Sequence, residues 1–290
     1  MKKPTEKGSK HGKKTTGKKV RDILFGVLSF FLAFFLFLLS LCVLTELSLF
    51  NKDYWIDKMN STNYFSDKSE EITDKLVILG NASGLKKEFC ESIVDSIMVT
   101  SDTENYLDDF FRAGTGHIDT TAFKQKFVTE LDAYIKKNNA KVDQKNVDYL
   151  VKNAENQYKE CVHIPLLVTI SGYFHAVKKY LPYVMAGLVL LSAIIVLVLV
   201  FGNRWKHRVF KYLYFAAAAD FLALTTAAAY MSINGGLKNI NLESRAFYNM
   251  VVLFANEMNV ILWAEAAFFF ITAAAFFFLY RSLFLKLTAD

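Results

Sequence analysis

Four long apolar runs separated by polar segments dominate the pattern of hydrophobic and polar residues along this chain. The runs lie at residues 23–44, 180–201, 209–233 and 260–280. Each is long enough for an α-helix to cross a bilayer, which takes about 20 residues at a rise of 1.5 Å per residue. With their flanking residues, they predict transmembrane helices at 22–50, 179–201, 209–233 and 259–281. We therefore expect an all-α polytopic membrane protein with a four-span transmembrane helix bundle.

A polar segment, residues 51–178, separates the first predicted span from the second and is rich in Lys, Glu, Asp and Asn. Its apolar residues recur at helical spacing, as in the series Leu85, Phe89, Ile93 and Ile97. Such spacing places apolar side chains on one face of a helix. The segment is therefore predicted to be a helical extracytoplasmic domain of about five helices around one small core.

Several residues of this segment have the positions of helix caps. Ser101 is followed three residues later by Glu104, the spacing of a capping box, and Asp119 and Asp143 precede two later apolar series. Side chains of these types accept hydrogen bonds from the free N–H groups of a first helical turn. Pro165 is expected to begin the last helix before the second span, since proline is well tolerated in a first turn.

The charges give the chain a predicted orientation. Residues 1–21 carry nine Lys and Arg against one acidic residue, and the short loop 202–211 carries four basic residues. The segment 51–178 holds 16 basic and 20 acidic residues, a net charge of −4. Because Lys and Arg concentrate in cytoplasmic loops, we expect both termini, 282–290 included, and the loop 202–211 to lie on the cytoplasmic side of a cell membrane. Residues 51–178 and 234–258 are then extracytoplasmic.

The N-terminal tail, residues 1–21, lacks apolar periodicity and is expected to be disordered. Its basic residues suit anionic lipid of the inner leaflet, which we favour as a partner over nucleic acid. The apolar run that follows exceeds the roughly 7–15 residues of a signal peptide and is followed by no A-x-A site. It is therefore interpreted as an uncleaved anchor.

The third and fourth spans carry many alanines, which allow close approach of membrane helices, so we expect them to pack as an antiparallel pair. Between them, Gly235 and Gly236 predict a turn. Residues 243–257 have a helical pattern, and two placements are open. This helix either lies on the outer membrane surface or extends the fourth span outward.

Two carboxylates inside the apolar runs, Asp220 and Glu265, are the candidate functional residues of the spans. A charged side chain in the bilayer costs several kcal/mol, so such residues face a bundle interior and often carry function. Counting along each helix places them about 10 Å apart in depth, too far for a direct pair. The candidate hydrogen-bond partners are Thr225 and Thr226 for Glu265, and Thr272 for Asp220. The two interpretations are a proton- or cation-linked site and polar contacts that join packed helices.

Cys90 and Cys161 are the two cysteines of the predicted outer domain. The external face of a cell is oxidising, so they are a candidate disulfide, and the alternative is two separate buried thiols. A bridge would close a loop of about 70 residues, worth on the order of 4 kcal/mol in the chain-entropy model.

Signatures of enzymes are absent from the sequence, which contains no G-x-S-x-G, H-E-x-x-H, P-loop or C-x-x-C motif. We therefore expect no enzymatic activity, no catalytic residues, no cofactor and no metal site. The predicted function is that of a membrane protein whose outer helical domain binds a partner or ligand, or scaffolds a cell-envelope complex. A protein of the membrane or envelope is the expected partner. The alternative is a small transporter or channel subunit that uses the intramembrane carboxylates.

Overall fold

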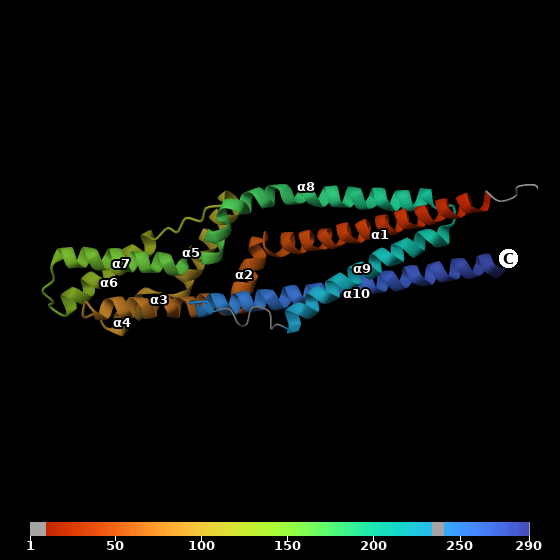
Figure 1. The fold of residues 1–290 in the computed structure, drawn as a ribbon. Coiled ribbons are helices and arrows are strands. Elements are labelled where there is room, and N and C mark those ends of the chain that lie inside the picture. The colour runs from red at the N-terminus through yellow and green to blue at the C-terminus, as the bar shows by residue number, and fades with distance from the viewer. Residues whose placement is uncertain (1–9, 234–240, 290) are drawn as a thin grey trace, which may run out of the picture. The chain divides into compact units, whose positions relative to one another are not determined.

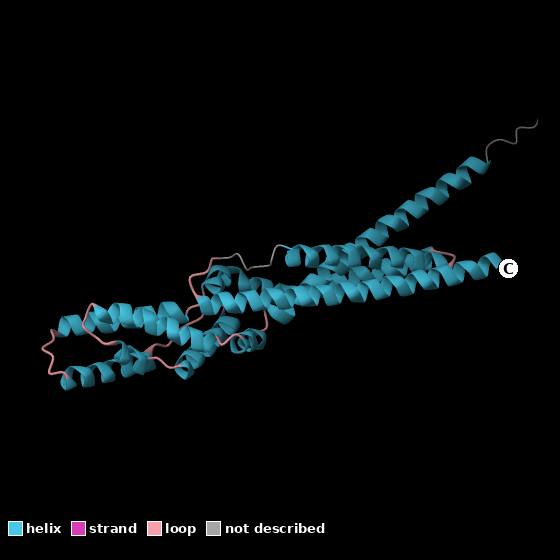
Figure 2. Cartoon of the chain, turned by 90° about the horizontal axis from the view of Figure 1, so that it is seen from below, coloured by secondary structure: helices cyan, strands magenta, loops and turns pink. Residues whose placement is uncertain are grey.

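The computed structural model describes residues 10–233 and 241–289 of the chain. It is 87% helical, and its described residues include no strand (Figures 1 and 2). Ten helices are present in these ranges: α1 (Lys10–Ser48), α2 (Lys52–Ser61), α3 (Tyr64–Asn81), α4 (Lys87–Ile93), α5 (Ser96–Ala113), α6 (Thr121–Lys137), α7 (Gln144–Val162), α8 (Pro165–Gly202), α9 (Lys206–Ile233) and α10 (Arg245–Ala289).

The chain divides into two compact units. One, here called the span unit, comprises residues 1–44, 181–234 and 258–290, and the other, here called the inserted unit, comprises 45–180 and 235–257. Three helices, α1, α8 and α10, contribute residues to both units. Residues 241–257, which precede the fourth span, therefore belong to the same unit as the segment between the first and second spans.

Four of the described helices are long and apolar enough to cross a membrane. They contain the candidate spans Lys19–Ser48, Thr169–Gly202, Lys206–Ile233 and Arg245–Leu287. The prediction of an all-α chain with one N-terminal span, three late spans and helices between them is confirmed. By the length and composition of these helices, the chain is a candidate multi-pass membrane protein.

Several helices extend beyond the ranges that hydropathy predicts. α1 begins at Lys10, inside the stretch expected to be disordered, while residues 1–9 lie outside the described residues. α8 begins at Pro165, as predicted, but continues without a break through Pro182 to Gly202. α10 begins at Arg245, so the helix predicted at 243–257 extends the fourth span. The predicted turn at Gly235 and Gly236 lies outside the described residues.

α3 is the helix around which the inserted unit packs. It lies against α7, α5 and α4, and α6 packs against α4 and α7 (Figure 1). The core is made by the apolar faces that the helical spacing predicts, and aromatic rings fill much of it. The Tyr158 ring stacks on Phe123 with centroids 4.2 Å apart, and both side chains are fully buried.

The helix caps agree with the sequence at some positions and differ at others. Asp143 caps α7, accepting a hydrogen bond of 3.0 Å from the backbone N–H of Lys145, as predicted. The prediction of a cap at Ser101 is wrong, because α5 begins five residues earlier, at Ser96. Its cap is Asp95, which accepts a 2.8 Å hydrogen bond from the N–H of Met98. α5 ends at Ala113, and its C-cap is Gly114, whose φ of +75° is favourable for glycine.

Two buried clusters hold the span unit together. One joins α1, α8 and α9 and includes Leu32, Ala33, Ile195, Leu199 and Ala216. The other joins α1, α9 and α10 and includes Leu44, Leu224, Ala228, Leu262 and Ala266. Alanines on α9 and α10 lie in these contacts, as expected for helices that approach closely in a membrane.

Candidate functional site

Glu265 is hydrogen-bonded to the first span. The hydroxyl of Ser40 on α1 donates to the Glu265 carboxylate of α10 over 2.5 Å, and Ser40 is buried. This contact joins the first and last spans of the chain. Sequence reasoning missed Ser40 because a single serine in an apolar run gives no sign of the helix it faces.

Among the Asp, Glu, Lys and Arg residues of the described chain, Asp220 is the most buried, with 1% of its surface exposed. One of its carboxylate oxygens, Oδ2, has no hydrogen-bond partner in the structure. A buried polar atom without a partner is uncommon in folded proteins and calls for an explanation. This carboxylate therefore differs from that of Glu265, which has a donor.

The three threonines proposed as partners for these acids have other environments. The hydroxyls of Thr226 and Thr272 donate to carbonyl oxygens of their own helices, at Leu222 (2.7 Å) and Phe268 (2.9 Å). The hydroxyl of Thr225 is buried and has no hydrogen-bond partner. The structure thus pairs Glu265 with a residue that was not among the candidates.

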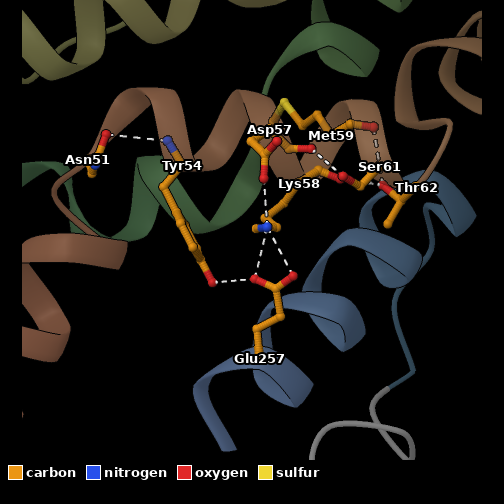
Figure 3. A network of polar contacts seen from close by, with 8 residues as sticks. All are labelled: Asn51, Tyr54, Asp57, Lys58, Met59, Ser61, Thr62 and Glu257. Atoms are coloured by element: carbon orange, nitrogen blue, oxygen red, sulfur yellow. Dashed lines mark hydrogen bonds and ion pairs between the residues drawn. The ribbon is translucent and has the colours of Figure 1, made fainter. Parts of the chain in front are cut away.

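In the inserted unit, a network of polar side chains connects α2 to the N-terminal part of α10. Figure 3 shows Tyr54 and Lys58 pointing from α2 toward Glu257. The Tyr54 hydroxyl and the Lys58 ammonium each donate to Glu257 over 2.9 Å, and Lys58 also contacts Asp57 at 2.6 Å. Hydrogen bonds to Asp57 and then to Glu257 raise the pKa of Lys58. Burial, with the Glu257 contact, raises the pKa of Tyr54 to about 12.

A second network connects α3 to the first turn of α10. The Glu71 carboxylate accepts hydrogen bonds from the Ser244 hydroxyl (2.8 Å) and from the backbone N–H of Ala246 (2.9 Å). Lys68, only 5% exposed, donates to both Glu71 and Ser244 over 2.9 Å. Partial burial opposes ionisation of Glu71, but the N–H of Ala246 and the ammonium of Lys68 outweigh it and lower the pKa of that carboxyl.

A groove lies between the loop that follows α3, the C-terminal part of α6, the loop from α6 to α7, and the first two turns of α7. Its volume is about 730 Å³, within the range of pockets that bind ligands. Apolar side chains make its wall, and polar side chains lie among them. The wall is formed by Leu85, Leu131, Tyr134, Ile135, Val142, Val147, Tyr149 and Leu150.

Lysines surround the loop that closes this groove. Residues 136–145 contain Lys136, Lys137, Lys141 and Lys145 but only one acidic residue, Asp143. All four lysines are exposed, and none forms an ion pair with a described residue. A smaller cavity of about 360 Å³ adjoins the groove and shares Tyr134 and Asn138 with it; two lysines, Lys86 and Lys137, and two acids, Glu88 and Glu130, are in its lining. The lysine-rich loop therefore borders a partly apolar groove whose own lining holds one lysine, Lys141, and one acid, Asp143.

The predicted disulfide is absent. Cys90 and Cys161 are both buried free thiols, and no pair of cysteines lies at disulfide distance. Cys90 packs beside Gly80 of α3, whereas Cys161 lies near Lys75 of the same helix. Five residues of helix separate these neighbours by about 7.5 Å, which keeps the sulfurs apart. Burial raises the pKa of both thiols.

Among the described residues, no group of three or more His, Cys, Asp or Glu side chains is arranged to hold a metal ion. Comparisons with protein-family models, with curated proteins and with solved structures find no match to this chain. The groove of the inserted unit and the polar residues of the spans are therefore the candidate functional features of the chain.

Proposed function

We propose that this chain is a non-enzymatic multi-pass membrane protein whose inserted unit binds an envelope protein through the groove between α6, α7 and the loop that follows α3. The observation that carries the proposal is the groove itself, with its apolar wall and its volume of about 730 Å³. The partner presents an apolar anchor beside acidic residues.

The apolar wall supports an anchored contact. Leu131 and Leu150 are buried at its base, while Val142 and Tyr149 are 50% and 71% exposed at its edge. Tyrosine is enriched at protein interfaces because its ring buries a large area and its hydroxyl stays hydrogen-bonded. An apolar side chain of a partner that packs in the groove would remove the exposed parts of Val142 and Tyr149 from water.

The lysines support an acidic partner. Four of them lie within ten residues, 136–145, without an ion pair to a described residue. Unpaired basic side chains around an apolar wall attract and orient a segment of opposite charge. A free anionic amphiphile would carry the same chemistry, and the experiment below separates it from a protein.

The orientation proposed with this function follows from the flanking charges. Basic residues lie at 1–21 and 202–211, and this charge pattern supports our proposal that the inserted unit is outside the cell and both termini are inside. The N-terminal basic residues then meet anionic lipid of the inner leaflet. The chain passes between the span unit and the inserted unit at three points, between residues 44 and 45, 180 and 181, and 257 and 258. These three connections suit a unit that presents a binding surface at the membrane.

Site-specific photocrosslinking of the full-length chain in its native membrane tests the proposal. A photoreactive phenylalanine analogue replaces Tyr149 or Val142 in the groove, and Ile78 of α3, 74% exposed and outside the groove, as the control. We expect one discrete protein adduct from both groove positions and none from position 78. Adducts of lipid mass alone, or equal adducts from all three positions, would contradict a protein partner at this groove.

Charge reversal provides the second arm. The double variant Lys141→Glu/Lys145→Glu should weaken formation of the groove adduct about tenfold, since it places like charges against the acidic partner. Lys152→Glu, an exposed lysine of α7 outside the groove lining, is the matched control and should leave the adduct unchanged. An adduct that is insensitive to the double variant would show that charge does not select the partner.

A further inference from the structure

Asp220 lies on the face of α9 that is buried in the span unit. Ala216, Asp220, Leu224 and Ala228 follow at intervals of four residues, and each is at most 2% exposed. Residues with this spacing share one face of a helix. Ala216 belongs to the cluster with α1 and α8, and Leu224 to the cluster with α1 and α10. The carboxylate therefore lies in the layer between the two clusters.

No cation is available to neutralise Asp220 in this layer. The packed segments 23–44 of α1 and 181–202 of α8 contain no charged residue, and 258–280 of α10 contains only Glu265. The remaining charged groups of the unit lie near its ends, where Arg208 pairs with Asp22 at 3.6 Å. The other charged or titratable groups of the described residues of this unit are Lys10, His11, Lys13, Lys14, Lys18, Lys19, Arg21, Cys42, Tyr183, Arg204, Lys206, His207, Lys211, Tyr212, Tyr214, Tyr230, Tyr280, Arg281 and Lys286.

A second polar atom without a partner belongs to the same part of the unit. The Ser192 hydroxyl of α8 is 7% exposed and makes no hydrogen bond. Ile195 of α8 and Ala216 of α9 belong to the same buried cluster. Ser192 lies about one turn before Ile195, and Asp220 lies about one turn after Ala216. Because α8 and α9 form an antiparallel hairpin joined by three residues, both polar residues lie on the same side of that cluster.

The hydrogen bonds of α1 give the depth of Glu265 relative to Asp220. Ser29 donates to the backbone oxygen of Tyr212 over 2.6 Å, and Ser40 donates to Glu265. Ser40 lies eleven residues beyond Ser29, and Asp220 lies eight residues beyond Tyr212. At 1.5 Å per residue the difference of three residues is about 5 Å, roughly one helical turn. The two carboxylates are therefore closer in depth than counting from the span ends indicates.

We propose that Asp220 is a proton-binding site inside the span unit, and that Glu265 with Ser40 is the group through which its proton is exchanged. In the exchange step, the protonated carboxyl of Glu265 releases its proton to a bridging water molecule and becomes a carboxylate, while that water gives a proton to the Asp220 carboxylate, which becomes the neutral acid. The reverse step returns the proton. A metal cation would need more oxygen ligands than the structure gathers around Asp220, so a proton is the ligand that fits.

Infrared spectroscopy of the full-length protein in lipid nanodiscs tests the binding site. Protonated carboxylic acids have a carbonyl stretch distinct from that of carboxylates, so spectra at low and high pH should differ by this band. We expect Asp220→Asn to remove a component of the band and Asp220→Glu to restore it. Thr226→Ala, an exposed position on the same span, should leave the band unchanged, with far-UV circular dichroism confirming the helix content of each variant. A band that persists in full in Asp220→Asn would overturn the site.

The rate of deuterium exchange tests the relay. After transfer to D₂O, the Asp220 component of the band shifts as its proton is replaced by deuterium. We expect Glu265→Gln and Ser40→Ala to slow this shift about tenfold or more while the component itself remains. An unchanged exchange rate in both variants would overturn the relay. A component that neither changes with pH nor exchanges with deuterium would show that Asp220 serves only as a polar contact between helices.

Discussion

The carboxylate of Glu71 on α3 accepts a 2.9 Å hydrogen bond from the backbone N–H of Ala246, in the first turn of α10. The residues are 175 positions apart in the chain. The first turn of any helix leaves N–H groups without intrahelical partners, and a carboxylate there also interacts favourably with the helix dipole. The helix that continues into the fourth span therefore has its N-terminus capped by a different helix of the inserted unit.

Glu71→Gln should destabilise this cap. The variant keeps an acceptor for Ala246 but leaves the buried Lys68 without its charged partner, which costs about 1–3 kcal/mol. Hydrogen exchange of peptides covering residues 245–248, in the full-length protein, measures the effect. We expect faster exchange in Glu71→Gln than in Glu70→Gln, whose side chain is exposed and forms no ion pair with a described residue. Equal protection in the two variants would contradict the role of Glu71.

The same carboxyl gives the cap a defined pH dependence. Because the folded pKa of Glu71 is lower than its unfolded value, its contribution to stability is complete above the unfolded pKa. The contribution is lost as the pH falls through the folded pKa, when the carboxylate becomes protonated. Protection of residues 245–248 should therefore fall at acidic pH in the wild type and much less in Glu71→Gln.

Asp102 should have the opposite dependence. It accepts a 2.5 Å hydrogen bond from the Tyr158 hydroxyl, but burial dominates and raises its pKa above the ordinary value. Its contribution to stability is thus complete below the unfolded pKa and is lost as the pH rises through the folded pKa. Between the unfolded and the folded pKa of Asp102, the midpoint of thermal unfolding should depend less on pH in Asp102→Asn than in the wild type. At neutral pH the midpoint of the variant should be no lower than that of the wild type. A midpoint that falls at neutral pH would contradict this assignment.

Lys58→Ala should cost more stability than Lys52→Ala. The Lys58 side chain is 11% exposed and contacts Asp57, which is 65% exposed, and Glu257, which is 36% exposed, so its removal leaves mainly the Glu257 carboxylate without a cation. Because both acids are partly in water, we expect a loss of about 1–2 kcal/mol, below that of a fully buried pair that loses one partner. Lys52 pairs with Asp108 at the surface, where such pairs contribute about 0–1 kcal/mol. Chemical unfolding of the full-length chain in detergent measures both, and similar losses would contradict the distinction.

The sequence was sufficient for features that depend on local pattern. Run length predicts the four spans, and four-residue spacing predicts the helices of the inserted unit. Contacts between distant segments were not predictable, because Ser40 and Glu265 are 225 residues apart and neither neighbouring sequence indicates the other. The disulfide prediction failed for the same reason, since cysteine spacing carries no information on which level of α3 each thiol faces.

Labelling of single cysteines in intact expressing cells tests most directly the claim that the inserted unit presents its groove outside the cell. The native Cys90 and Cys161 are 1% and 3% exposed, and the half-buried Cys42 is replaced by alanine, so background labelling should be low. With a membrane-impermeant maleimide, Tyr149→Cys should be labelled in intact cells, and Arg204→Cys only after the membrane is permeabilised. The opposite pattern, labelling at position 204 but not at 149 in intact cells, would contradict the account.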